Sequence, residues 1–182
     1  MKKSFLLIAL VGLTTFSFAQ KKKVTTSATV AFDASTKLDP LAVAENKTAV
    51  ASLNPKTGEV AFETVVKNFA FSNPKMQEHF NSAGWMDSDK FPAASFKGKI
   101  TNLSAVKFNS DGTYTTSVTG DLTIRGVTKP VTATATVVVS GKTVTTTSAF
   151  EIKVADYGVN GPAIGAGKVA TDPKITVSAE FK

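Results

Sequence analysis

The chain has 182 residues, of which 42% are hydrophobic and 19% charged, with a formal net charge of +7. This length suits one domain that can fold without disulfide bonds, and the absence of cysteine excludes disulfides, thiolate nucleophiles and zinc sites with cysteine ligands. The basic residues form no basic helix and no aromatic RNA-recognition pattern, so we predict no nucleic-acid partner.

The N-terminal segment has the pattern of a secretory signal peptide. A short basic start precedes an apolar run, Phe5–Leu13, and small and aromatic residues follow the run as far as Ala19. The run is too short for a membrane-spanning helix. We therefore expect residues 1–19 to be removed by cleavage before Gln20. The mature domain, residues 20–182, is then expected in the periplasm or outside the cell, with no transmembrane segment.

Alternating apolar and polar residues predict about eight antiparallel β-strands after this segment. In chain order they are Val24–Phe32, Ala49–Leu53, Glu59–Lys67, Ala94–Phe108, Tyr114–Ile124, Val131–Val139, Val144–Val154 and Ile175–Phe181. Turn-forming residues separate several of them, as in Arg125-Gly126-Val127-Thr128-Lys129. Several strands exceed the usual length of about five or six residues. Long strands with one apolar face favour a closed lipocalin-like barrel, and a two-sheet sandwich is the alternative.

One short helix interrupts the strands, over residues 74–83. Asn73-Pro74 supplies a capping residue and a suitable first turn, and Met76 and Phe80 fall four residues apart on one side. The glycine-rich segment Gly158–Gly167 reads as a flexible connection between strands. The predicted fold class is therefore all-β, an extended antiparallel eight-stranded barrel with one short helix.

The apolar faces of the strands include many residues that are too small to fill a core. They are Thr116, Gly120, Ala133, Ala135, Thr146, Ser148 and Ala179. Because protein cores pack as densely as organic crystals, small inward residues either leave volume for a ligand or face large side chains in a tapering barrel.

No set of residues predicts catalysis or metal binding. His79 is the only histidine, and neither a nucleophile with an orienting acid nor a second metal ligand stands at a useful spacing from it. Asp87 and Asp89, with Glu78 nearby, lack the glycine and further acids of a calcium loop. Gly161–Lys168 is unlike a phosphate-binding loop, because it lacks the first glycine and a following helix. We predict no enzyme, no metal site and no cofactor.

Three segments together resemble the YceI-like family. They are MQEHFNSAGWMDSDKFPAASFKGKI (residues 76–100), GDLTIRGVTKPV (residues 120–131) and ADYGV (residues 155–159). The resemblance covers essentially the whole mature chain, although the first predicted strand lacks the Trp and the His-Ser pair that many members carry. It implies an exported, lipocalin-like barrel around an apolar tunnel, with the helix at His79 beside it, and binding of polyisoprenoids or other lipids.

The strand pattern and the resemblance together predict a non-enzymatic carrier of a long apolar ligand, a polyisoprenoid or fatty-acid-like lipid. The alternative is a structural or protein-interaction barrel whose lumen is filled by its own side chains. The lipid is the one partner predicted, and the oligomeric state stays open. The residues expected to contact the ligand are Phe71, Met76, Phe80, Trp85, Met86, Phe96, Tyr114, Val118, Gly120, Leu122, Ala133, Ala135 and Phe150.

Overall fold

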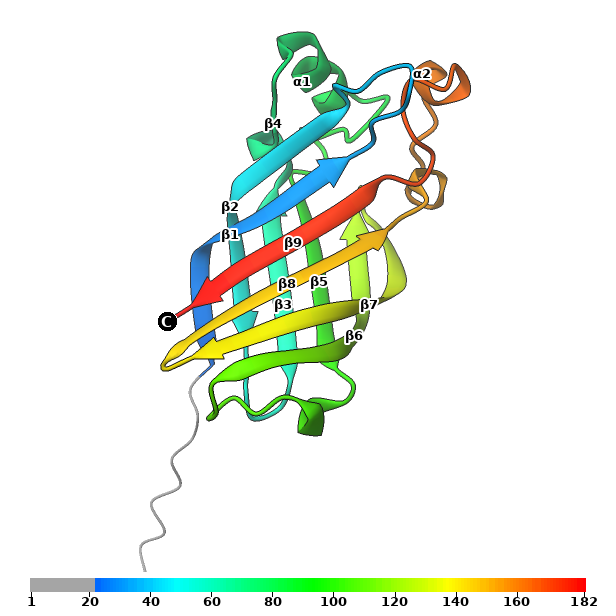
Figure 1. Ribbon diagram of the computed structural model, residues 1–182. Coiled ribbons are helices and arrows are strands. Elements are labelled where there is room, and N and C mark those ends of the chain that lie inside the picture. Colours follow the sequence, from blue (N-terminus) through cyan, green and yellow to red (C-terminus); the bar gives the residue numbers. More distant parts are fainter. Residues whose placement is uncertain (1–21) are drawn as a thin grey trace, which may run out of the picture.

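Antiparallel β-strands make up most of the computed structural model, which describes residues 22–182 (Figure 1). The predicted signal peptide and its cleavage site between Ala19 and Gln20 lie outside the described residues. Within the described residues, no helix is long and apolar enough to cross a membrane.

The strands form one closed barrel. They are β1 (Lys23–Asp33), β2 (Val43–Leu53), β3 (Glu59–Val65), β4 (Ala70–Phe71), β5 (Ala93–Ile100), β6 (Gly112–Ile124), β7 (Val127–Ser140), β8 (Thr143–Glu151) and β9 (Lys174–Phe181). The order is β1-β9-β8-β7-β6-β5-β3-β2, and β1 also pairs with β2, which closes the ring. The two-residue strand β4 adds to β2. The ring confirms the predicted all-β, eight-stranded barrel over the two-sheet sandwich.

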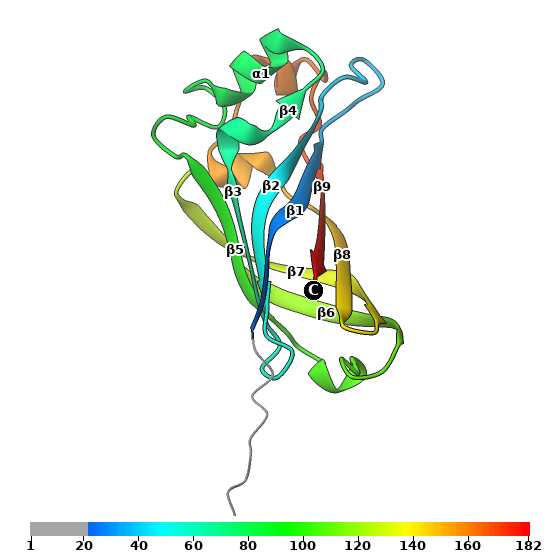
Figure 2. The ribbon, with the colours of Figure 1, turned by 90° about the vertical axis from the view of Figure 1, so that its left-hand side faces the viewer.

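Short helices and turns accompany the strands. They are the 3₁₀ turns η1 (Val66–Asn68), η2 (Leu103–Ala105) and η3 (Val154–Tyr157), and the helices α1 (Pro74–Asn81) and α2 (Pro162–Gly165). Figures 1 and 2 show α1, α2 and β4 at one end of the elongated barrel, which we call the capped end. The β7–β8 turn and η2 lie at the opposite end, the far end.

The predicted alternation of side chains holds along β6. Thr116 and Leu122 are buried, whereas Thr115 and Thr119 are exposed, as successive side chains of a strand require. β6 and β7 pair in one uninterrupted register from Gly112 to Ile124. With 13 and 14 residues, these strands are about 40 Å long at ~3.3 Å per residue.

The turn between β6 and β7 is shorter than the sequence predicted. Only Arg125 and Gly126 stand between the strands, with φ values of 49° and 74°. Two residues with positive φ match the right-handed twist of the flanking strands, so β7 begins at Val127 rather than at Val131.

Other predicted boundaries were also wrong, two of them by six residues or more. The predicted strand Ala94–Phe108 ends at Ile100, where the chain turns into η2 and the Asn102 Oδ1 accepts hydrogen bonds from the Thr116 hydroxyl and the Ser117 N–H. The second strand begins at Val43 instead of Ala49. The glycine-rich connection contains α2.

α1 occupies the position of the predicted helix and is two residues shorter. The Asn73 Oδ1 accepts the N–H of Lys75 at 2.9 Å, which is the expected N-terminal cap. At the other end, the Ser82 N–H and hydroxyl both donate to the His79 carbonyl, and the helix stops at Asn81.

Candidate functional site

Two apolar cavities lie along the inside of the barrel. The near cavity, on the side of α1, has a volume of about 100 Å³, and the far cavity, toward the far end, about 90 Å³. An apolar cavity of ~150 Å³ in another protein stays dry and takes up benzene, so each space is somewhat smaller than one that holds a small apolar molecule, and the two together are larger. The barrel interior is therefore the candidate functional site.

Small residues create the far cavity. Of the small inward residues that the sequence pattern singled out, the following line it: Thr116, Ala133, Ala135, Thr146 and Ser148. Two of their hydroxyl groups are bonded within the wall. Thr116 donates to the Asn102 Oδ1 at 2.5 Å, and Ser148 donates to the Thr134 carbonyl at 2.8 Å. With those donors already used, the far cavity presents a largely apolar surface.

The aromatic pair Phe62 and Phe96 separates the two cavities. These residues lie directly opposite each other on β3 and β5, and both line both cavities. Val177 of β9 also borders both spaces. A ligand long enough to occupy the whole lumen must therefore pass these side chains.

A pair of glycines accommodates the Phe96 ring. Gly98 and Gly120 lie opposite each other on β5 and β6. A Cβ atom on Gly120 would be 2.4 Å from the Gly98 Cα and 2.7 Å from the Phe96 Cζ. Of the two interpretations of the small inward residues, Gly120 therefore fits the second, because the neighbouring backbone and the Phe96 ring fill the space beside it.

The near cavity is closed at the capped end by an aromatic cluster around Phe80 of α1. Phe80 is buried, and its ring centroid lies 5.7 Å from that of Phe32, 5.6 Å from Phe69 and 5.0 Å from Phe71. Rings at these separations and tilts pack favourably. Phe80 thus acts as a stopper between the lumen and the outside.

A third cavity, the outer cavity, lies on the other side of this stopper. Its volume is about 310 Å³, and it shares Phe32, Phe80 and Trp85 with the near cavity. Met76, His79 and other residues of α1, the β1–β2 loop and the α2 segment line the rest of it. The outer cavity is therefore separated from the lumen by side chains of this shared set.

Arg125 joins three separate segments at the capped end. From the β6–β7 turn, its guanidinium donates to the Gly158 carbonyl at 2.5 Å and to the Ala83 carbonyl at 3.0 Å. Beside it, a Cβ on Gly126 would be 2.8 Å from the Phe91 ring. The three segments that carry the family resemblance thus meet at one place in the structure.

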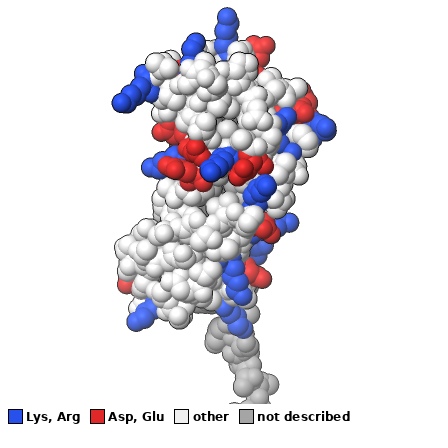
Figure 3. Space-filling model, turned by 90° about the vertical axis from the view of Figure 1, so that its right-hand side faces the viewer, with Lys and Arg blue, Asp and Glu red and all other residues white. Residues whose placement is uncertain are grey.

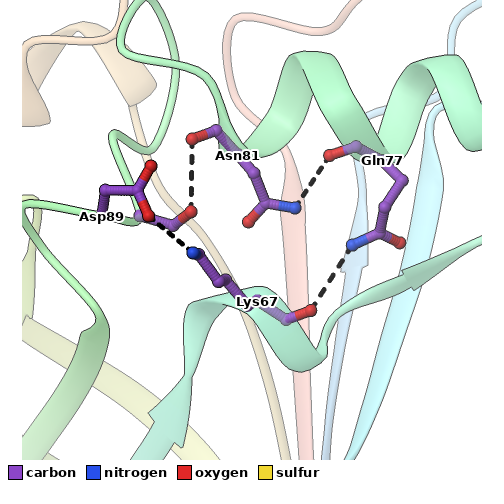
Figure 4. Close-up of polar contacts among 5 residues, drawn as sticks. Lys67, Gln77, Asn81 and Asp89 are labelled. Atoms are coloured by element: carbon purple, nitrogen blue, oxygen red, sulfur yellow. Dashed lines mark hydrogen bonds and ion pairs between the residues drawn. The ribbon is translucent and has the colours of Figure 1, made fainter.

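A second set of polar contacts lies around α1 and η1 (Figure 4). Lys67 pairs with Asp89 at 2.6 Å, and the Gln77 side chain donates to the Lys67 carbonyl at 3.5 Å. The Asn81 amide donates to the Gln77 carbonyl at 2.8 Å. The Gln77 bond thus joins α1 to η1, and the Lys67–Asp89 pair joins η1 to the segment after α1, whereas the Asn81 bond lies within the helix.

Two titratable side chains, Tyr157 and His79, lie at different cavities. Tyr157 is buried and lines the near cavity, and desolvation, with a smaller contribution from the charge of Asp156, raises the pKa of its phenol. His79 lies in the outer cavity and is exposed. Among residues 22–182, no three His, Cys, Asp or Glu side chains are grouped so as to hold a metal ion.

The structure places most of the sequence-predicted contact residues around these cavities. The near cavity is lined by Phe80, Trp85, Met86, Phe96 and Leu122, and the far cavity by Phe96, Val118, Ala133, Ala135 and Phe150. Phe71 and Met76 line the outer cavity. Tyr114 and Gly120 line none of the three, and the Tyr114 hydroxyl donates to the Ser110 carbonyl at 2.8 Å, which closes the turn before β6.

Sequence reasoning missed other lining residues. Some, such as Val60 and Phe62, lie on strand faces whose alternation was recognised. The segment at and just after η3 supplies further lining residues, because Val154, Tyr157 and Val159 line the near cavity. The apolar side chains of these missed residues were the one signal in the sequence that could have indicated a place in the cavity lining.

Comparison with known proteins agrees with this architecture. The family model described as the YceI-like domain matches residues 14–181. A UPF0312 protein of Pseudomonas putida is 33% identical over 136 residues, which are 69% of this chain and 64% of the relative. The chain thus spans just under two thirds of the length of that relative.

Solved structures share the fold. BcnA of Burkholderia cenocepacia has a TM-score of 0.70 at 22% identity, covering 85% of this chain and 96% of that one. A polyisoprenoid binding domain from Saccharophagus degradans, implicated in plant cell wall breakdown, has a TM-score of 0.73 at 11% identity, covering 88% and 97%. Because the family model matches residues 14–181, nearly the whole chain, this protein belongs to the YceI-like family.

Proposed function

We propose that the protein binds a long apolar molecule, of the polyisoprenoid or fatty-acid class, inside the barrel and carries or stores it without changing it chemically. The observation that carries this proposal is the pair of apolar cavities that follow one another along the lumen. The structural neighbour described as a polyisoprenoid binding domain supports the ligand class.

The apolar lining is sufficient for affinity. Burying a CH₂ group contributes about 0.8 kcal/mol, so ten carbons offer roughly 8 kcal/mol before the cost of ordering the chain and the protein. Because the Thr116 and Ser148 hydroxyls are already bonded, they offer little to a polar ligand. Binding then selects chain length and shape.

A ligand longer than one cavity requires movement at Phe62 and Phe96. In the structure these side chains border both cavities. Rotation of aromatic side chains would join the cavities into one tunnel. We therefore expect short apolar chains to occupy one cavity and long chains to span both.

Among the described residues, those that line the two lumen cavities include no histidine and no cysteine, which favours binding over acid–base or nucleophilic chemistry. Tyr157 has a pKa above its ordinary value, so its phenol stays protonated at neutral pH. The solitary His79 lies outside the stopper, in the outer cavity. We expect His79→Ala to abolish no activity, and a hydrolytic activity that disappears in a folded His79→Ala variant would contradict the proposal.

The N-terminal pattern supports a place for this carrier in the periplasm, or outside the cell as the alternative. Isoprenoids and fatty acids have little solubility in water, and a closed barrel shields them during passage. Recovery of the protein from the periplasmic fraction with Gln20 as its first residue would support this location. An exported protein that retains Met1 would contradict it.

Filling the cavities tests the function. Ala94→Phe in the near cavity and Ala135→Phe in the far cavity should each weaken binding of a fluorescent long-chain lipid at least tenfold. The melting temperature should hold or rise, because filling an open cavity causes less strain than overpacking a dense core. Ala93→Phe and Thr134→Phe are the matched controls, since both residues are exposed on the other face of the same strands.

The same variants distinguish the alternative function. A barrel filled by its own side chains should melt at a lower temperature in both cavity variants and should bind no lipid before or after the change. Unchanged lipid binding in both cavity variants would show that the lipid lies elsewhere.

A further inference from the structure

The loop between β1 and β2 displays apolar side chains to solvent at the capped end. Leu38 is 71% exposed and Leu41 50% exposed, and they are followed by Val43 at 38%. The other large exposed apolar residues among residues 22–182 are single valines on different strands. Figure 2 shows this loop projecting beyond the barrel. Leucines on a projecting loop make no contribution to the core.

The tip of this loop has a defined conformation. The Thr36 hydroxyl accepts the N–H groups of Leu38 and Asp39, both at 3.2 Å, and the Asp39 Oδ1 accepts the N–H of Leu41 at 2.9 Å. Pro40, between them, has no N–H. The backbone donors of residues 38–41 are thus all satisfied within the loop, which removes much of the cost of transferring this backbone out of water.

The loop stands next to the outer cavity. Asp39 and Ala42 line that cavity, together with Met76 of α1 and Lys168. At its base, the Ala170 N–H donates to the Ala34 carbonyl at 2.9 Å, which fixes the loop to the segment after α2. The exposed leucines therefore flank the cavity that leads to the Phe80 stopper.

We propose that the β1–β2 loop docks the protein on a lipid bilayer, with Leu38 and Leu41 inserted at the level of the headgroups. Leucine side chains enter this region readily, and nearby lysines strengthen the contact with anionic lipids. Lys37 and Lys168 stand at the loop and the cavity, where Asp39 carries the opposite charge, and Figure 3 shows basic side chains projecting from the same end with acidic ones among them. The docked orientation turns the outer cavity toward the bilayer, so that a lipid can enter without crossing water.

Vesicle binding tests the docking directly. The purified protein is sedimented with vesicles of phosphatidylcholine containing one part in five phosphatidylglycerol, and the double variant Leu38→Glu, Leu41→Glu is compared with it. We expect the variant to bind vesicles at least tenfold more weakly, because two charged groups would have to enter the headgroup region. The matched controls Val50→Glu and Val138→Glu change exposed valines on the barrel wall and should bind as the parent does.

Lipid uptake tests the docking separately from lipid binding in the lumen. The biological purpose of the docking rests on that proposed function. A fluorescent long-chain lipid is offered either in the vesicles or free in dilute solution. The leucine variant should take it up from vesicles at least tenfold more slowly and bind it from solution as the parent does. Vesicle binding without any lipid uptake would support the docking and contradict the lumen as a lipid site.

Other outcomes would overturn the docking. They are a parent protein that does not bind vesicles, a leucine variant that binds them as well as the parent, and wall variants that lose as much binding as the leucine variant. A leucine variant that lost association with another protein while keeping vesicle binding would assign the loop to a protein partner instead.

Discussion

The far half of the barrel and its capped end enclose similar cavities by different means. Strands alone surround the far cavity, and their backbone hydrogen bonds form continuous ladders, of which β6–β7 is the longest. The near cavity is completed by α1, η3 and the loops around them. Those segments are held by side-chain contacts such as the Phe80 cluster and the Arg125 bonds.

The hydrogen bonding of the capped end is also less complete. Among residues 22–182, the buried side-chain atoms without a hydrogen-bond partner are Asn81 Oδ1 and Arg125 Nε, and both belong to this end. Segments that depend on a few side-chain contacts open at a lower free energy than continuous sheet. We therefore expect the capped end to open while the barrel stays closed, and ligands to enter there.

The largest effect should come from removing the stopper. Phe80→Ala deletes a buried ring that contacts three others, and we expect it to lower the free energy of unfolding by about 3–5 kcal/mol. Hydrogen exchange should accelerate most in residues 66–91 and least in β6 and β7. Uniform acceleration throughout the chain would show that the cap and the barrel open as one unit.

An added methyl group at the pair Gly98 and Gly120, on β5 and β6, should lower the free energy of unfolding. In Gly120→Ala the new methyl group would lie 2.4 Å from the Gly98 Cα and from the Lys97 carbonyl oxygen, and backbone cannot easily yield. We expect a loss of about 3 kcal/mol in the free energy of unfolding, measured with urea. The matched control is Gly165→Ala, whose methyl would meet no atom within 4 Å. Equal free energies of unfolding for the two variants would mean that β5 and β6 can move apart at Gly120 with little loss of stability.

A smaller effect on the free energy of unfolding is expected at Arg125, where the β6–β7 turn contacts the capped end. Arg125→Asn removes both bonds of the guanidinium while keeping a residue that tolerates the positive φ of 49°. The expected loss is about 2 kcal/mol, because charged donors form the stronger hydrogen bonds. Exchange should accelerate around Ala83 and Gly158. Lys129→Asn, at an exposed position on β7, is the control.

Sequence patterns predicted the barrel strands better than the segments of the capped end, for a physical reason. Alternation is local, so the inward face of β6, with Thr116 and Leu122, was identified correctly. The role of Gly120 depends on its pairing with Gly98 and on the position of the Phe96 ring, which only the strand register determines. No local pattern contains that information.

The cap depends on contacts between segments far apart in the chain. The bonds from Arg125 to Ala83 and Gly158 span 42 and 33 residues. The exposed leucines were overlooked because the second strand was expected to begin at Ala49, which left residues 33–48 without an assigned conformation. The family resemblance marked the segments that meet at the capped end but not their contacts.

The most direct test of the central claim is native mass spectrometry of the protein purified from its own cells, beside the Ala135→Phe variant purified in the same way. We predict that the parent carries one long apolar molecule, detected as a discrete added mass that is released on unfolding. The variant should carry none, or only a shorter one. A parent without added mass that also binds no long-chain lipid in solution, or the same ligand in both proteins, would contradict a lipid site in the lumen.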